Sequence, residues 1–158
     1  MKKLLSVLSI ICTLFLLIGC GKSVIFDEKV SFPDANWAFE NKAVTFKAPL
    51  TASEKPLAVI LELELIETPN VDKFLATFTM VTPRGAKTIK SLLFNFIFPQ
   101  EPYIQGSKPN EKIYRLVVYP EKYFSETGEY SFEVNQFSNN ADNYGIRSLR
   151  MFIETVKK

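Results

Sequence analysis

The apolar residues of this chain recur with a period of two, and this pattern constrains its fold more than any other feature. The clearest segment runs from Leu57 to Ile66, where aliphatic side chains alternate with Glu62 and Glu64. Such alternation is typical of a half-buried β-strand, because successive side chains point to opposite faces of a sheet. The two glutamates are therefore expected on a solvated face. The same spacing leaves a catalytic carboxylate pair open as the alternative.

Seven further segments show strand patterns. They cover residues 24–32, 44–47, 74–81, 88–98, 113–119 and 128–136, and a last strand that places Leu149, Met151 and Ile153 inward. The segment 88–98 carries apolar side chains on both faces and is expected to be a central strand. A single helical turn is expected within residues 121–126. Proline, glycine and asparagine residues mark the connections between the strands.

About eight short strands, with no amphipathic helix and no internal repeat, predict an all-β fold. We expect an antiparallel β-sandwich of jelly-roll type, formed as one domain by residues 24–158. The 14 Phe, 6 Tyr and 1 Trp suit this architecture, because aromatic side chains pack well on pleated surfaces.

The amino terminus has the three parts of a secretory signal. Met1-Lys2-Lys3 precedes an apolar run from Leu4 to Ile18, which is shorter than a comfortable bilayer span. The run ends in Leu17-Ile18-Gly19-Cys20, which is similar to a bacterial lipobox. In such lipoproteins the peptide is cut before the cysteine, whose sulfur carries a diacylglyceryl group, and the new amino terminus is acylated by a fatty acid such as palmitate.

Residues 1–19 are therefore predicted to be a lipoprotein signal peptide, and residues 20–23 a lipidated Cys20 with a short tether. Two or three acyl chains hold a protein on a membrane almost permanently, whereas one is marginal. The alternative is an uncleaved membrane anchor in which Cys20 is incidental. Three or four extended residues reach only about 10 to 14 Å, so the folded domain is expected to lie against the lipid headgroups.

The processed chain is expected to carry no net charge. Cleavage before Cys20 removes 19 of 158 residues and lowers the basic count from 19 to 17, against 17 acidic residues. A nucleic-acid-binding protein is expected to show a basic excess or stripe, so that class is set aside.

The residue types that carry most enzyme chemistry are missing. Histidine is absent, Cys12 leaves with the signal peptide, and Cys20 becomes a thioether. Serine or cysteine nucleophiles paired with histidine, zinc ligands and Gly-rich phosphate loops are therefore not expected. The chain is predicted to be no enzyme and to need no cofactor, and an enzyme built on carboxylates alone is a third hypothesis.

Aromatic residues near strand ends are the candidate contacts for a ligand or partner. Trp37 lies beside turn residues, Tyr103 lies in the long connection 99–111, and Tyr144 precedes the last strand. Such residues can stack on sugar rings or anchor a partner protein. Trp37 is also placed to plug the end of the sandwich, and that role is favoured for it.

The loop before the last strand is rich in oxygen-bearing side chains. Asn139, Asn140, Asp142 and Asn143 offer the hard ligands that Ca²⁺ prefers, but only one is a carboxylate. A turn stabilised by local hydrogen bonds is the favoured interpretation, so no metal site is predicted.

The order of these motifs resembles the GldH-like gliding-motility lipoproteins. The motifs are the lipobox, a strand ending near Phe32-Pro33, Trp37, Ala43-Val44-Thr45-Phe46, the segment from Gly128 to Gln136, and Gly145-Ile146 before the final strand. The resemblance implies a β-sandwich lipoprotein of the cell envelope, associated with motility and protein secretion, and brings no catalytic residues. The Gly- and Trp-rich segment expected before the penultimate strand is replaced here by residues 99–111.

We therefore expect a non-enzymatic accessory subunit of a gliding-motility or secretion-type machine, anchored through Cys20 and in contact with other envelope proteins. Gly21 follows the cysteine, rather than the Asp that retains some lipoproteins in the inner membrane, so the outer membrane is the expected location. The alternative is a carbohydrate-binding lipoprotein that uses Tyr103, Trp37 or Tyr144 as a stacking platform.

Overall fold

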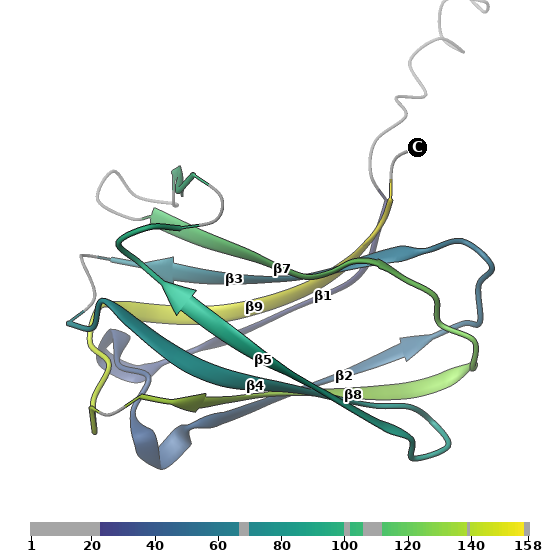
Figure 1. Cartoon of the computed structure of the whole chain (residues 1–158), viewed down its shortest axis with the longest axis horizontal. Helices are drawn as coiled ribbons and strands as arrows, with labels where there is room; N and C mark the ends of the chain where they lie inside the picture. The colour runs from purple at the N-terminus through teal and green to yellow at the C-terminus, as the bar shows by residue number, and fades with distance from the viewer. Residues whose placement is uncertain (1–22, 67–69, 100–101, 106–111, 139, 157–158) are drawn as a thin grey trace, which may run out of the picture.

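Two antiparallel sheets pack face to face in the computed structural model (Figure 1), which describes residues 23–66, 70–99, 102–105, 112–138 and 140–156. The strands are β1 (Val24–Ser31), β2 (Ala43–Leu50), β3 (Leu57–Leu65), β4 (Lys73–Val81), β5 (Lys87–Asn95), β6 (Ile104–Gln105), β7 (Lys112–Lys122), β8 (Gly128–Phe137) and β9 (Ile146–Thr155). Two short 3-10 turns, η2 (Pro33–Ala35) and η3 (Phe39–Asn41), connect β1 to β2. No helix in these described ranges is long and apolar enough to cross a membrane.

The strand order confirms the expected sandwich. One sheet has the order β1-β9-β3-β7-β6 and the other β2-β8-β4-β5. With the two-residue β6 set aside, these are two four-stranded sheets in the strand order of a jelly roll. The chain crosses to the other sheet between all successive strands except β4 and β5. Each pairing is antiparallel. We call them the five-stranded and the four-stranded sheet.

The core lies between the sheets and is rich in aromatic side chains. Phe46, Phe78, Phe94 and Phe132 are fully buried. Phe78 and Phe132 meet with ring centroids 5.8 Å apart, and Phe94 lies 4.9 Å from Phe74. Leu149, Met151 and Ile153 are all 0% exposed, so the last strand faces inward as predicted. These contacts supply the burial that stabilises a domain without a disulfide.

The two ends of the sandwich differ in what they carry. At one end, Val24 pairs with Glu154 and Leu57 pairs with Thr155, so the chain enters β1 and leaves β9 side by side. We call this the tether end, after the tether predicted for residues 20–23; it also holds the connections 51–56, 82–86 and 123–127 (Figure 1). The opposite, distal end holds residues 32–42, 70–72, 96–99 and 140–145.

Strand β5 is an edge strand, so its prediction as a central strand was wrong. Its inner face contributes Leu92 and Phe94 to the core, whereas Leu93 on its outer face is 45% exposed. Lys90 also points inward: its ammonium donates to the carbonyl of Val118 at 3.0 Å. An inward lysine of this kind protects an edge from pairing with another chain.

The region after Tyr119 also differs from the prediction. Strand β7 continues through Pro120 to Lys122, and residues 121–126 form no helical turn. Tyr119 pairs with Val59 and Lys122 with Leu57, so two residues of β7 lie opposite Ala58 alone. A bulge leaves a residue outside the ladder, and the missing N–H of proline therefore costs no ladder hydrogen bond there.

Candidate functional site

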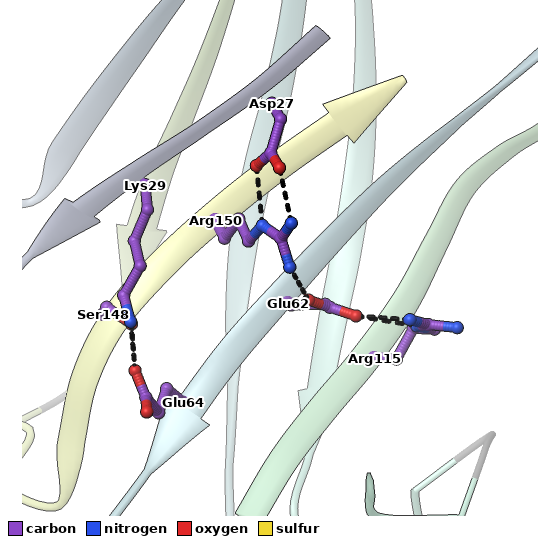
Figure 2. A network of polar contacts seen from close by, with 7 residues as sticks. All are labelled: Asp27, Lys29, Glu62, Glu64, Arg115, Ser148 and Arg150. Carbon is purple, nitrogen blue, oxygen red and sulfur yellow. Dashed lines mark hydrogen bonds and ion pairs between the residues drawn. The ribbon is translucent and has the colours of Figure 1, made fainter. Parts of the chain in front are cut away.

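A network of charged side chains covers the outer face of the five-stranded sheet (Figure 2). Glu62 of β3 lies opposite Arg115 of β7 and opposite Arg150 of β9 in the strand register. Arg115 Nε and Nη2 donate to Glu62 Oε1 at 3.0 and 2.5 Å, and Arg150 Nη1 donates to Oε2 at 3.2 Å. Both carboxylate oxygens of Glu62 are therefore occupied by guanidinium groups.

Arg150 extends the network to the edge strand β1. Its Nε and Nη2 donate to the two carboxylate oxygens of Asp27 at 2.6 and 2.5 Å. This bidentate bond from Arg150 holds the pKa of Asp27 below its ordinary value, and it outweighs the opposing effect of burial. Asp27 in turn raises the pKa of Arg150. One ionic chain thus joins β1, β9, β3 and β7.

Glu64 forms a second group two residues along β3. It is paired with Lys29 of β1, and the hydroxyl of Ser148 donates to its Oε2 at 3.1 Å. Glu62 is 5% exposed and Glu64 7%, so the prediction that both lie on a solvated face was wrong. The long side chains of Lys29, Arg115 and Arg150 cover them. A period of two shows that residues share a face of the sheet. It does not show whether long side chains from neighbouring strands cover them.

The network has the geometry of a structural element. Phe152 lies within it, with the Arg150 and Arg115 guanidinium carbons 5.2 and 5.5 Å from its ring centroid. Glu62 and Glu64 line none of three surface grooves, of about 570, 580 and 300 Å³, that the described residues form. Carboxylates that are held by cations on a filled surface are poorly placed to exchange protons with a substrate.

Trp37 lies inside the distal end of the core. It is 0% exposed, stacks on Phe32 with centroids 5.1 Å apart, and meets Phe74 edge-on at 5.7 Å. Its Nε1 donates to the carbonyl of Asn41 at 3.1 Å. The indole therefore has no free face for a ligand, and it fills the end of the sandwich.

The two tyrosine candidates are placed differently. Tyr103 is half-buried: its hydroxyl donates to the carbonyl of Phe96 at 2.6 Å, its ring packs against Tyr114, and burial raises its pKa. Tyr144 is 51% exposed at the distal end. The structure does not bring the three aromatic candidates together as a platform. Cys20, the predicted lipid attachment site, lies outside the described residues.

The segment 140–145 is tied to its neighbours by hydrogen bonds. Asn36 donates to the Asp142 carboxylate at 2.7 Å, and Asn143 donates to the carbonyl of Trp37 at 2.9 Å. The backbone N–H of Asn143 donates to Asn36 Oδ1 at 2.9 Å. Asn139 lies outside the described residues, and the described residues hold no cluster of three metal-binding side chains of the His, Cys, Asp or Glu type.

A groove of about 570 Å³ opens at the distal end beside the outer face of the four-stranded sheet. Its lining residues are Val71, Asp72, Lys73, Phe74, Leu75, Leu93, Phe137, Ser138 and Asn140. Leu75 pairs with both Leu93 and Phe137, so these side chains form one row across β8, β4 and β5. They are 56%, 45% and 49% exposed. We call these three residues the apolar row.

Two more exposed apolar side chains follow in the sequence. Ile97 and Phe98 lie two and three residues after the end of β5, in the connection at the distal end, and are 54% and 77% exposed. Clustered exposed apolar residues of this kind mark interaction surfaces more often than single ones do. The row is not evident from the sequence, although Leu75, Leu93 and Phe137 each stand on the outer side of their strand's alternation. The missing information was the register that aligns the three strands.

Comparison with known proteins gives no family. No family model and no curated protein matches the sequence. Among solved structures, the chain is similar to the VP2 subviral particle of infectious bursal disease virus, with 10% identity and a TM-score of 0.33. The match covers 86% of this chain and about a third of the viral one (32%). At this score the likeness carries no argument about function, so the chain is described by its own geometry: a jelly-roll sandwich with an apolar row at its distal end.

Proposed function

We propose that this protein is a lipid-anchored lipoprotein of the cell envelope, attached through Cys20 to the outer membrane, that binds another envelope protein through the apolar row. Within that assembly it acts as a non-enzymatic accessory subunit of a gliding-motility or secretion-type machine. The observation that carries the proposal is the position of the row. Leu75, Leu93 and Phe137 lie at the distal end, whereas Ser23 and β1 emerge at the tether end.

This arrangement suits an anchored binding subunit. The ten residues of β8 span about 30 Å at the rise of an extended strand. A protein held at one end of the sandwich therefore presents the apolar row well away from the bilayer, where a partner in the envelope can reach it. The resemblance to GldH-like lipoproteins supports the choice of a motility or secretion machine.

Binding through the row is consistent with its chemistry. Lys73, Asp72 and Asn140 line the groove together with the exposed leucine and phenylalanine side chains. A desolvated apolar centre with a polar rim is the usual composition of a protein interface. The carbohydrate-binding alternative is weakened, because Trp37 is buried and the Tyr103 hydroxyl is engaged, which leaves Tyr144 as its one exposed aromatic candidate.

The test is complementation of a deletion strain by variants of the full-length lipoprotein. Leu75→Asp/Leu93→Asp places charges in the row and is expected to abolish motility, secretion or surface-protein assembly, whichever the deletion disturbs. Desolvating unpaired carboxylates at an interface is costly, so the partner should also be lost from a pull-down of the native protein.

Ile89→Asp is the matched control. Ile89 is on the same outer face of β5 and is 64% exposed, but it lies opposite Thr79, outside the row. This variant should complement fully. The proposal is wrong if the double variant also complements, or if the deletion strain is normal in all three processes and no envelope protein is retained by the tagged lipoprotein.

A further inference from the structure

A second groove, of about 580 Å³, lies at the tether end. Its lining residues are Glu54, Lys55 and Pro56 before β3, Glu121 and Tyr123 at the end of β7, and Thr155 and Val156 at the end of β9. The length of the sandwich separates it from the distal groove. Its surface combines charges of both signs with an aromatic ring and aliphatic atoms.

The start of the described chain is fixed beside this groove. The N–H of Ser23 donates to the hydroxyl of Thr155 at 3.0 Å, and the N–H of Thr155 donates to the carbonyl of Ser23 at 3.0 Å. Only Gly21 and Lys22 separate Ser23 from Cys20. Because three extended residues reach about 10 Å, an acyl chain on Cys20 holds this end of the sandwich within the thickness of a headgroup layer.

The side chains around the groove suit that position. Tyr123 is 59% exposed, and Val24 and Ile25 at the start of β1 are 51% and 47% exposed. Tyrosine is enriched at membrane interfaces, since its ring is apolar and its hydroxyl is polar. Among the described residues, Glu54, Lys55 and Glu121 are paired in none of the salt bridges found.

We propose that the tether end is a lipid-contact surface, in which the groove around Tyr123 lies among phospholipid headgroups and sets the orientation of the sandwich on the membrane. Lys55 then faces headgroup phosphates, and Glu54 and Glu121 face headgroup amines. The inference rests on the proposed lipid anchor and adds to it a fixed orientation: strands upright on the bilayer, and the apolar row pointing away.

Site-directed fluorescence in vesicles tests the orientation. The processed protein has no free thiol, because Cys12 is removed and Cys20 is acylated, so a single introduced cysteine takes a bimane label specifically. Tyr123→Cys and Glu54→Cys report on the groove, and Tyr144→Cys at the distal end is the control, since all three positions are exposed. The vesicles contain phosphatidylethanolamine, phosphatidylglycerol and a lipid with a nitroxide on its headgroup.

We expect quenching several-fold stronger at positions 123 and 54 than at position 144, because short-range nitroxide quenching does not extend over a strand length of about 30 Å. For protein that is acylated and bound to vesicles, equal quenching at the three positions, or weak quenching at all of them, overturns the inference. Failure of the anchor itself is distinguished by intact mass: a protein without acyl chains that stays off the vesicles overturns the proposed function as well.

Discussion

The outer faces of the two sheets differ in how far their side chains are exposed to solvent. On the five-stranded sheet, Glu62 and Phe152 are each 5% exposed, because arginine side chains from neighbouring strands cover them. On the four-stranded sheet, Leu75 and Phe137 are 56% and 49% exposed and have no such cover. The charged groups of the first face find partners within the chain, whereas the second face leaves apolar side chains exposed to solvent.

This difference predicts that substitutions on one face alter stability and that substitutions on the other alter binding. A covered face contributes to folding, and changing it should alter the free energy of unfolding. An uncovered face contributes little to folding, and changing it should alter binding. Pairs of matched substitutions, one on each face, can therefore break or sharpen the comparison.

The largest effect is expected for a pair of phenylalanines. Phe152→Ala should lower the free energy of unfolding by about 3 kcal/mol, as for other buried phenylalanines, because the ring is enclosed between Arg115 and Arg150. Phe137→Ala on the other face should cost about 1 kcal/mol or less, since half of that side chain is already in water. Urea unfolding of both variants measures the difference. Equal losses would contradict the comparison.

The next effect concerns ion pairs. Arg150→Ala removes the partner of Asp27 and one of the two partners of Glu62. Breaking a fully buried pair costs about 3–5 kcal/mol, and because the Arg150 side chain is 40% exposed we expect about 2 kcal/mol.

Lys47→Ala on the four-stranded sheet is its control. The Lys47 and Glu129 side chains are 66% and 61% exposed at 3.5 Å, so their pair should contribute less than about 1 kcal/mol. Chemical denaturation at low and high salt compares the two variants. A loss for Lys47→Ala as large as that for Arg150→Ala would show that burial does not set the value of these pairs.

A smaller effect on the free energy of unfolding is expected at acid pH, where Asp27 becomes protonated. Arg150 lowers the pKa of Asp27 in the folded protein, so between the folded and unfolded pKa values the unfolded state binds more protons, and stability rises with pH. The contribution is present above the unfolded value of about 3.9 and is lost as pH falls through the folded one. Wild type should therefore exceed Asp27→Asn in stability at pH 7, and the gap should close toward pH 2. A gap that is constant with pH would contradict the assignment.

The smallest effect is expected for the apolar row. Leu93→Thr replaces the leucine with a β-branched residue that suits an exposed strand position, so the unfolding free energy should change by less than about 0.5 kcal/mol. Thermal unfolding checks this, and partner retention in a pull-down should fall at the same time. A strongly destabilised variant would mean that the row belongs to the folding core.

Much of the fold follows from the sequence because strand periodicity is local. The alternation in Leu57–Leu65 and in Gly128–Phe137 specifies a strand and its two faces without reference to the rest of the chain. The turn at Gly85 is equally local, since its positive φ of 85° favours glycine. The all-β sandwich was therefore predictable, and so was the inward face of the last strand.

The candidate sites were less predictable because they depend on register between distant strands. Arg115 and Arg150 reach Glu62 across 53 and 88 residues of sequence, and this contact converts an apparently wet face into a covered one. The apolar row likewise exists because Leu75 lies opposite Leu93 and Phe137. The sequence by itself determined the fold class and most of the strands with their alternating faces, which are patterns read within a few residues. Only the tertiary structure decided which faces are covered, which strand is an edge, and which end of the sandwich lies opposite the tether, because these depend on how separate strands are ordered and aligned.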